Sequence, residues 1–278
     1  MISDCELAEA FWRSGRTDDC PVIDMHGHMG PFTGIWFPRE TPEAMIHTMD
    51  SAGVRLLCFS HHLAFKTPEV SNAASIAATR RYPQRLRVYM AVNPHYPAAL
   101  SRDLESWDEY SDVYIGLKLH PTWFQIGLDD VAFEPALAFA ERRGLPVLTH
   151  TWGNDPYCDA GAVRRVARRH PECPLLLAHS LHDSWQEAID VAGEFPNIYL
   201  ELTAVLDDRP ALEIFVEAGL SERLLFGTDL PWFDPHHGIG AVLSAEIEDE
   251  DRHNILHRNA ERLLARAGVE TQMLSGGR

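Results

Sequence analysis

Residues 22–28 read Val-Ile-Asp-Met-His-Gly-His, and the interpretation of the whole chain starts from this stretch. Two apolar residues followed by polar side chains at every second position are typical of a buried β-strand, in which alternate side chains point to one side. His26 and His28 converge only in such an extended segment, because residues two apart on a helix do not face each other. Two imidazoles on one face can bind a divalent metal ion, although surface histidines in a polar turn would give the same triplet. Asp24 shares this face one layer deeper, where a hydrogen bond to a ligand histidine and a purely structural one are both open.

The rest of the chain alternates between short apolar strands and helical segments. The expected strands are Pro21–His28, Arg55–Ser60, Leu86–Val92, Val113–Leu119, Pro146–Thr149, Pro174–Ala178, Ile198–Leu202 and Arg223–Thr228. The expected helices are Ile2–Gly15, a helix from the N-cap Thr41 to Gly53, Pro68–Arg81, Pro97–Tyr110, Asp130–Arg143, Asp159–His170, Asp183–Ala192, Ala211–Ala218 and Arg252–Ala267. The loop from Met29 to Glu40 is too long for a simple connection and is a candidate lid.

Eight strands that are each followed by a helix predict parallel pairing with right-handed crossovers. Closing eight such units gives a single (β/α)8 TIM barrel, a fold that needs about 250 residues. The chain has 278 residues. We expect one domain over residues 1–278, with a leading helix within 1–20 and a C-terminal helix and tail within 252–278. A doubly wound open sheet is the alternative, but it usually carries a glycine-rich phosphate turn after its first strand, and the sequence has none there.

Composition excludes several classes of partner. The formal net charge of −17 disfavours nucleic acid and anionic membranes, which both need a basic protein surface. No apolar run approaches the ~20 residues that cross a bilayer, and the acidic N-terminal stretch does not resemble a signal peptide. The scattered, odd set of five cysteines favours a reducing cytoplasm over a disulfide framework. The sequence leaves open whether the chain forms a homo-oligomer.

Polar residues gather at the predicted strand ends. They are His26 and His28, His61, Asn93, Lys118 and His120, His150, His179, Glu201 and Asp229. In a barrel these ends meet at the face where active sites lie. One histidine on an apolar strand is more often a hydrogen-bonded core residue than a ligand. Burying so many polar groups without a function would cost a few kcal/mol each, so a metal centre is the favoured interpretation.

Five motifs resemble the amidohydrolase superfamily, and more narrowly its amidohydrolase-2 branch, which includes enzymes similar to aminocarboxymuconate-semialdehyde decarboxylase and to lactone hydrolases. The motifs are His26-Gly27-His28, residues 116–121 (Gly-Leu-Lys-Leu-His-Pro), His150, His179 and residues 227–229 (Gly-Thr-Asp). Residues 255–264 resemble the terminal helix of that family, so the resemblance covers nearly the whole chain. The resemblance is specific evidence for the fold and for a metal, but it is weak evidence for the identity of the substrate.

The resemblance and the chemistry of the residues together imply the roles at the site. His26, His28 and Asp229, with His150 as a further ligand, would hold zinc, and the centre would contain one or two divalent ions. The metal would activate a water molecule, and Asp229 would pass that water's proton to the leaving group. His179 would bind a second ion or polarise the substrate.

Lys118 decides between two designs. A neutral lysine beside a cation can take up carbon dioxide, and the resulting carbamate would bridge two metals, with His150 and His179 holding the second ion. Alternatively, Lys118 stays charged and binds a substrate carboxylate. A salt bridge between Lys118 and Glu201 is the purely structural alternative.

Further residues are expected to bind substrate. They are His61, His120, Trp36, Trp152 and Glu201. Five tryptophans fall in loops after predicted strands, namely Trp36, Trp123, Trp152, Trp185 and Trp232, and would line an apolar mouth for a planar or cyclic compound. Packing between loops, or a dimer interface, would explain them equally well.

The favoured function is a metal-dependent hydrolase that cleaves an ester, lactone or amide of a small organic substrate. The alternative is a metal-dependent decarboxylase or hydratase, which is a lyase. A barrel that only binds a ligand would be expected to show gaps among the strand-end residues, and there are none.

Overall fold

The structure is a computed structural model that describes residues 5–208 and 210–269. The strands are β1 (Val22–Met29), β2 (Val54–His61), β3 (Leu86–Ala91), β4 (Tyr114–Leu119), β5 (Val147–Trp152), β6 (Leu175–His182), β7 (Ile198–Glu201) and β8 (Leu224–Leu225). The helices are α1 (Glu6–Ser14), α2 (Pro42–Ala52), α3 (Pro68–Arg81), α4 (Pro97–Glu105), α5 (Pro121–Phe124), α6 (Glu134–Arg143), α7 (Ala160–Arg169), α8 (Trp185–Glu194), α9 (Ala211–Glu217), α10 (Pro235–Ser244), α11 (Asp249–His253) and α12 (Asn259–Arg266). Residues 2–4 of the expected first helix and residues 270–278 of the expected tail lie outside the described residues.

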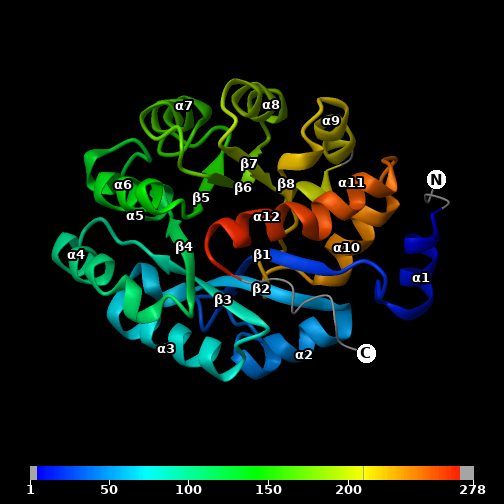
Figure 1. Ribbon diagram of the computed structural model, residues 1–278, viewed down its shortest axis with the longest axis horizontal. Helices are drawn as coiled ribbons and strands as arrows, with labels where there is room; N and C mark the ends of the chain where they lie inside the picture. The colour runs from blue at the N-terminus through cyan, green and yellow to red at the C-terminus, as the bar shows by residue number, and fades with distance from the viewer. Residues whose placement is uncertain (1–4, 209, 270–278) are drawn as a thin grey trace.

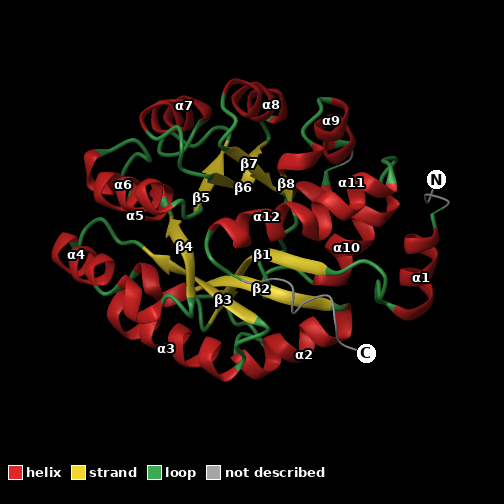
Figure 2. Ribbon diagram, in the orientation of Figure 1, coloured by secondary structure: helices red, strands yellow, loops and turns green. Residues whose placement is uncertain are grey.

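In the described residues, eight parallel strands form one sheet in the order β1 to β8, so each strand pairs with the next one along the chain. Hydrogen bonds just beyond β8 connect the sheet back to β1. The N–H of Met25 donates to the carbonyl of Phe226 over 2.9 Å, and the N–H of Asp229 donates to the carbonyl of His26 over 2.7 Å. The helices surround this ring of strands (Figures 1 and 2). The predicted (β/α)8 barrel is therefore confirmed.

Local signals in the sequence set the helix ends. The hydroxyl of Thr41 accepts a hydrogen bond from the N–H of Ala44, and Pro42 occupies the first turn of α2. Gly53 then ends this helix with a left-handed backbone, φ 79°. The helix α3 begins at Pro68 and ends at Arg81, at the predicted residues.

The interior of the barrel is closed at the amino-terminal end of the strands. Inward-facing side chains of several strands form a core of their own, and residues of α12 complete this core. Its members include Ile23, Met25, Leu56, Tyr89, Ile115, Leu176 and Leu225 of the strands, with Ala260, Leu263 and Leu264 of α12. In Figure 1, α12 lies across the middle of the ring of strands. In the part of the chain that the structure describes, the barrel interior is therefore open at the carboxyl-terminal end, where the polar residues lie.

The structure departs from the sequence prediction at several places, among them the following. The predicted strand Arg223–Thr228 is shorter, because residues 226–229 leave the ladder and Asp229 adopts a left-handed backbone, φ 57°. The predicted helix Arg252–Ala267 is divided by a π-helical turn, η6 (Asn254–Arg258). The helix α10 was not predicted.

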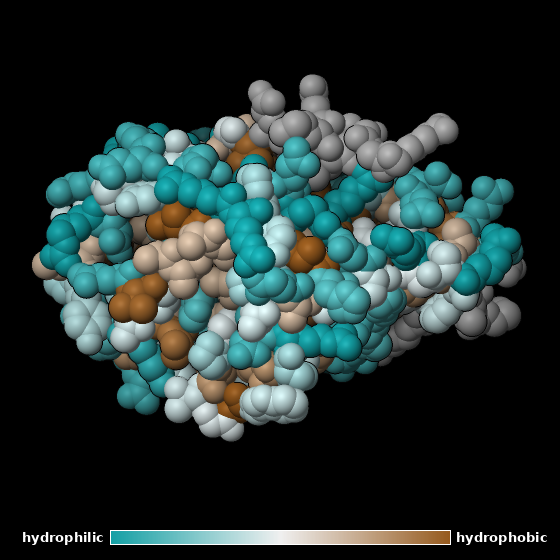
Figure 3. Space-filling view, turned by 90° about the horizontal axis from the view of Figure 1, so that it is seen from below, coloured by the Kyte–Doolittle hydropathy of each residue, from teal (hydrophilic) through white to brown (hydrophobic). Residues whose placement is uncertain are grey.

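The outer surface is mostly hydrophilic on the face shown in Figure 3, with hydrophobic residues scattered among polar ones. Within residues 5–208 and 210–269, no helix has the length and hydropathy of a membrane span.

Candidate active site

Three donor atoms of the kind that binds metals meet at the carboxyl-terminal end of the barrel. His26 and His28 lie on β1, Asp229 follows β8, and their donor atoms all lie within 4.8 Å of one another. Oδ1 of Asp229 lies 3.1 Å from Nε2 of His26 and 2.9 Å from Nε2 of His28. Ligands that share one divalent ion at about 2.1 Å stand roughly 3 Å apart, so these separations suit a common ion.

Asp229 carries the clearest sign that a cation belongs here. Its Oδ1 is buried, and among the described residues it has no hydrogen bond of good geometry, although the two imidazole nitrogens lie close to it. Leaving a buried charged oxygen unpaired costs about 1–3 kcal/mol or more, and a bound cation removes that cost. The left-handed backbone of Asp229 is of the strained kind that clusters at functional sites. Two imidazoles and a carboxylate fit zinc or manganese.

Glu201 holds the ring of His26 from behind. Its Oε2 lies 2.8 Å from Nδ1 of His26, while its Oε1 accepts hydrogen bonds from the N–H (2.7 Å) and hydroxyl (2.6 Å) of Thr203. The carboxylate keeps the His26 proton on Nδ1, so the lone pair of Nε2 is left for an ion. Burial lowers the pKa of His26 well below its usual value, which also favours the neutral ring. Glu201 was expected to contact substrate, but it is not among the residues that line the cavity, and it lies behind His26 and orients that ring.

The carboxylate of Asp24 accepts hydrogen bonds from backbone N–H groups and from one hydroxyl. Its Oδ1 accepts hydrogen bonds from the N–H groups of His26 (3.0 Å) and Thr228 (3.2 Å), and its Oδ2 accepts one from the Thr228 hydroxyl. Asp24 therefore ties β1 to the segment that follows β8. The bond to His26 reaches the backbone N–H of that residue and not its ring, which fits the structural one of the two roles left open from the sequence.

Lys118 lies at the centre of the site. This β4 residue is buried, and its Nζ lies 2.8 Å from Nε2 of His26. Burial lowers the pKa of Lys118 to about 8, although Asp229 and Glu201 oppose the shift. The amine therefore loses its proton more readily than an exposed lysine, and both designs predicted from the sequence remain compatible with its position.

The other strand-end histidines form a row of rings beside the three potential metal ligands. Ring centroids are 5.4 Å apart between His26 and His179, 4.9 Å between His179 and His150, and 4.2 Å between His150 and His120. Nδ1 of His179 lies 3.3 Å from the carbonyl of Thr203, which orients this ring. Burial lowers the pKa of His179 to about 4, so the ring is neutral at pH 7. His150 and His179 are next to the three-ligand group but are not members of it.

A cavity of about 430 Å³ opens above these residues. Lys118, His120, His150 and His179 line it, together with His26, His28 and Asp229. Its remaining wall is largely aromatic and includes Phe32, Phe65, Trp123, Trp152, Trp232 and Phe233. The sequence analysis anticipated the three tryptophans but missed the phenylalanines, because their pattern does not differ from that of core residues.

The loop from Met29 to Glu40 covers part of the mouth. Phe32 from this loop packs edge-on against Trp123 at 5.4 Å and against Trp232 at 5.3 Å. Phe37 packs against Trp232 at 4.8 Å. These contacts join the loop after β1 to the loops after β4 and β8, as expected of a lid.

Besides Glu201, three further predicted residues are not among those that line this cavity. The ring of His61 is buried against Gly30, and its Nδ1 accepts a hydrogen bond from the N–H of Leu63. The Trp36 side chain is 83% exposed. Trp185 packs against Phe215 and His182 instead. His61 ends β2, Trp36 lies in the loop after β1, and Trp185 begins α8, so the sequence does not show which way these side chains point.

Sequence comparison identifies the family. The sequence model of the amidohydrolase family, described as Amidohydrolase, matches residues 23–266, which is most of the chain. The chain belongs to the amidohydrolase family. No curated protein matches this amidohydrolase.

Solved structures share the fold of this amidohydrolase. An uncharacterised TIM-barrel protein from Bordetella bronchiseptica is 25% identical, with a TM-score of 0.71 over 89% of this chain and 99% of that one. A 2,6-dihydroxybenzoate decarboxylase from Rhizobium is 15% identical, with a TM-score of 0.71 over 88% and 99%. A 5-carboxyvanillate decarboxylase from Novosphingobium aromaticivorans, solved with manganese, is 11% identical, with a TM-score of 0.71 over 88% and 96%.

Proposed function

We propose that this amidohydrolase is a metal-dependent decarboxylase of a small aromatic acid that carries a hydroxyl group beside its carboxylate. The observation that carries the proposal is the cavity itself, in which aromatic walls surround the ligand group and Lys118. Among its described lining residues, Lys118 is the only lysine or arginine. A planar ring fits between such walls, and a single carboxylate fits a single ammonium group.

The relatives support decarboxylation over the hydrolysis first expected from the sequence. Both decarboxylases named above act, by their names, on benzoates with a hydroxyl group next to the carboxylate. Apolar walls also favour this reaction, because the substrate's negative charge leaves the carboxylate when neutral CO2 forms, and low polarity disfavours the charged starting group.

The residues of this chain divide the work as follows. His26, His28 and Asp229 would hold one divalent ion, which supplies Lewis-acid binding of the carboxylate and phenol oxygens. Glu201 keeps the His26 lone pair directed at that position. The Lys118 ammonium attracts the substrate carboxylate, and the aromatic walls hold the ring in place.

Asp229 is proposed to move the proton that the reaction needs. Its carboxylate accepts the proton of the substrate's hydroxyl group and delivers it to the ring carbon that bears the carboxylate. The bond from that carbon to CO2 then breaks, its electron pair returns to the ring, and the phenolate oxygen takes a proton from solvent. One proton is gained and one CO2 is lost for each substrate.

The test is a product assay in D2O with the manganese-loaded and zinc-loaded protein. We expect 2-hydroxybenzoates carrying a second polar substituent to release CO2 and to give a phenol with one deuterium at the former carboxylate position. Asp229→Asn should abolish both. Cleavage of aryl esters or lactones without CO2 release from any of these acids would replace the proposal with hydrolysis.

A further inference from the structure

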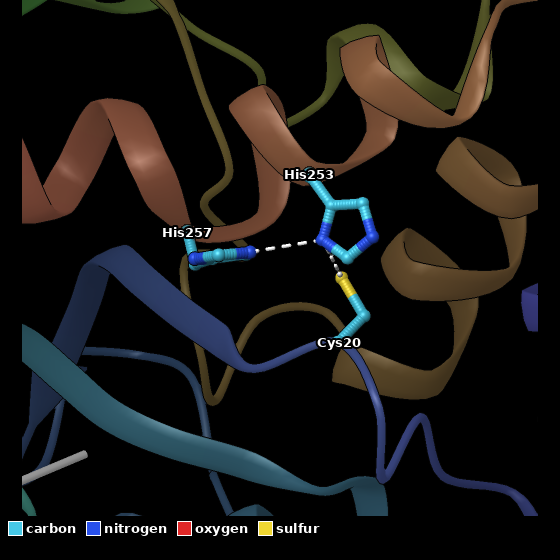
Figure 4. Close-up of side chains that lie close together, drawn as sticks. All are labelled: Cys20, His253 and His257. Carbon is cyan, nitrogen blue, oxygen red and sulfur yellow. Dashed lines mark hydrogen bonds between the residues drawn. The ribbon is translucent and has the colours of Figure 1, made fainter. Parts of the chain in front are cut away.

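A second group of potential metal ligands lies at the opposite end of the barrel. Cys20 lies two residues before β1 and is separated from it by Pro21. His253 directly precedes η6, and His257 lies within η6 (Figure 4). Nδ1 of His253 lies 3.4 Å from Sγ of Cys20 and 3.0 Å from Nε2 of His257. The three donor atoms all lie within 4.8 Å of one another. The group therefore joins two segments that are 233 residues apart.

The separations suit a tetrahedral ion. With zinc–nitrogen bonds of about 2.05 Å and a zinc–sulfur bond of about 2.3 Å, two nitrogen ligands stand about 3.3 Å apart, and a nitrogen and a sulfur about 3.6 Å. The observed contacts of 3.0 and 3.4 Å differ from these by a few tenths of an ångström. The third pair, Sγ of Cys20 and Nε2 of His257, lies within 4.8 Å, so binding the ion requires side-chain movements that draw these two atoms together.

A carboxylate orients one of the rings, as is usual for metal-bound histidine. Nδ1 of His257 lies 3.0 Å from Oε1 of Glu261, so its proton points to the carboxylate and the lone pair of Nε2 points to His253 and Cys20 (Figure 4). Such carboxylate–histidine pairs hold metal ligands in place. In the active site, Glu201 and His26 show the same arrangement.

The wide π-helical turn η6 contains His257 and follows His253 directly, so its backbone holds both rings of the group. The carbonyl of Ile255, inside the turn, accepts a hydrogen bond from the N–H of Phe226. This bond anchors the turn to the end of β8 beside the barrel. π-Helical turns are rare and are frequent at functional sites. Cys20 is fully buried, whereas His253 is only partly buried and leaves a route for an ion from solvent.

We propose that Cys20, His253 and His257 bind a zinc ion, with water as the fourth ligand, separate from the ion of the active site. About six residues of strand lie between Cys20 and the active-site histidines, so the two sites are about 20 Å apart. Binding converts the Cys20 thiol to a thiolate and releases its proton to solvent. The ion ties the start of β1 to the C-terminal helices that close the barrel, which makes it a structural site.

Cobalt titration tests this site separately from the active site. A thiolate bound to Co²⁺ gives an intense near-ultraviolet charge-transfer band, and no cysteine is among the described residues that line the active-site cavity. In Asp229→Asn, whose active site lacks one of its proposed ligands, we expect the band to saturate at one equivalent per chain. It should be lost in Cys20→Ser and kept in Cys173→Ser, whose buried thiol has only a backbone carbonyl, that of Leu145, within hydrogen-bonding range. It should also be kept in Asp229→Asn.

Zinc gives an independent readout on the same variants. One equivalent of zinc should raise the melting temperature of Asp229→Asn and of the double variant Asp229→Asn with Cys173→Ser. It should not raise the melting temperature of the double variant Asp229→Asn with Cys20→Ser. If Cys20→Ser does not fold, His253→Gln removes a partly exposed ligand and should weaken cobalt binding at least tenfold. No band in the wild-type protein, or a band that survives in Cys20→Ser or is unchanged in His253→Gln, overturns the proposal.

Discussion

Nζ of Lys118 lies 2.8 Å from Nε2 of His26, the same nitrogen that a metal ion would use. The ammonium and a divalent cation therefore compete for one lone pair, and their charges repel. If Lys118 acts as a free cation, Lys118→Met should bind manganese about tenfold or more tightly. The same variant should lose decarboxylation, because the substrate carboxylate loses its partner.

Metal content distinguishes this prediction from the carbamate design. It is measured by elemental analysis in a Cys20→Ser background, so that an ion beside Cys20 does not contribute. If Lys118 carries no carbamate, the protein should contain one ion per chain, and the variant with Lys118→Met added should also contain one. A fall from two ions to one would show instead that a carbamate on Lys118 bridges a pair of metals.

Glu201→Gln should weaken metal binding by about 10- to 100-fold. The amide oxygen would continue to accept from Thr203, so its NH2 group would face Nδ1 of His26. The proton of His26 would then move to Nε2, which removes the lone pair that binds the ion. Isothermal titration with manganese measures the effect. Glu69→Gln, a change at an exposed ion pair, serves as the control and should leave the affinity unchanged.

Gly227→Ala should also reduce metal binding, for a steric reason. A Cβ at this position would lie 2.1 Å from Oε1 of Glu201 and 2.9 Å from Cβ of His26, so both side chains must shift. Gly193→Ala in α8 is a matched control, because nothing lies within 4 Å of its added Cβ. The control should raise the melting temperature slightly, since alanine favours a helix by about 0.5–1 kcal/mol. Normal metal binding by Gly227→Ala would contradict the described packing.

Trp152→Ala should raise KM by roughly 2- to 10-fold, the equivalent of about 0.5–1.5 kcal/mol of ring contact. Trp152 lines the cavity, whereas Trp36 is exposed and does not, so Trp36→Ala should leave KM unchanged. Steady-state kinetics with one aromatic acid compares the two. Equal effects in both variants would mean that the ring of the substrate does not rest on this wall.

Stability of the metal-free protein should fall between pH 6.5 and pH 4. Burial lowers the pKa of His61 from 6.5 to about 4, so in this window the unfolded chain binds a proton that the folded protein excludes. The free energy of unfolding is therefore highest above pH 6.5 and decreases as the pH drops. Urea midpoints at pH 7 and pH 5 should differ less in His61→Gln than in the parent. An identical difference in both would remove His61 as a contributor.

Sequence reasoning succeeded where a local rule was strong. Proline at the first helical turn and glycine after the last placed α2 closely, and the period-two pattern placed His26 and His28 on one side of β1. The convergence with Asp229 also followed, because it depends only on barrel closure. These features require few long-range details.

Other features depend on tertiary contacts that no local pattern encodes. The strand β8 is short because the backbone turns at Asp229. The π-helical turn places the carbonyl of Ile255 where it accepts a hydrogen bond from the N–H of Phe226. The direction of the His61 ring is set by Gly30, which is far away in sequence. Composition and periodicity contain no information about such pairs.

Because α12 closes the amino-terminal end of the barrel in the described residues, the cavity opens to solvent at the carboxyl-terminal end. Under the proposed reaction, the acid, CO2 and the phenol would all pass through the opening beside Phe32, whose ring packs against Trp232 at the mouth. Release of the phenol, the larger product, would then be the step most sensitive to solvent viscosity.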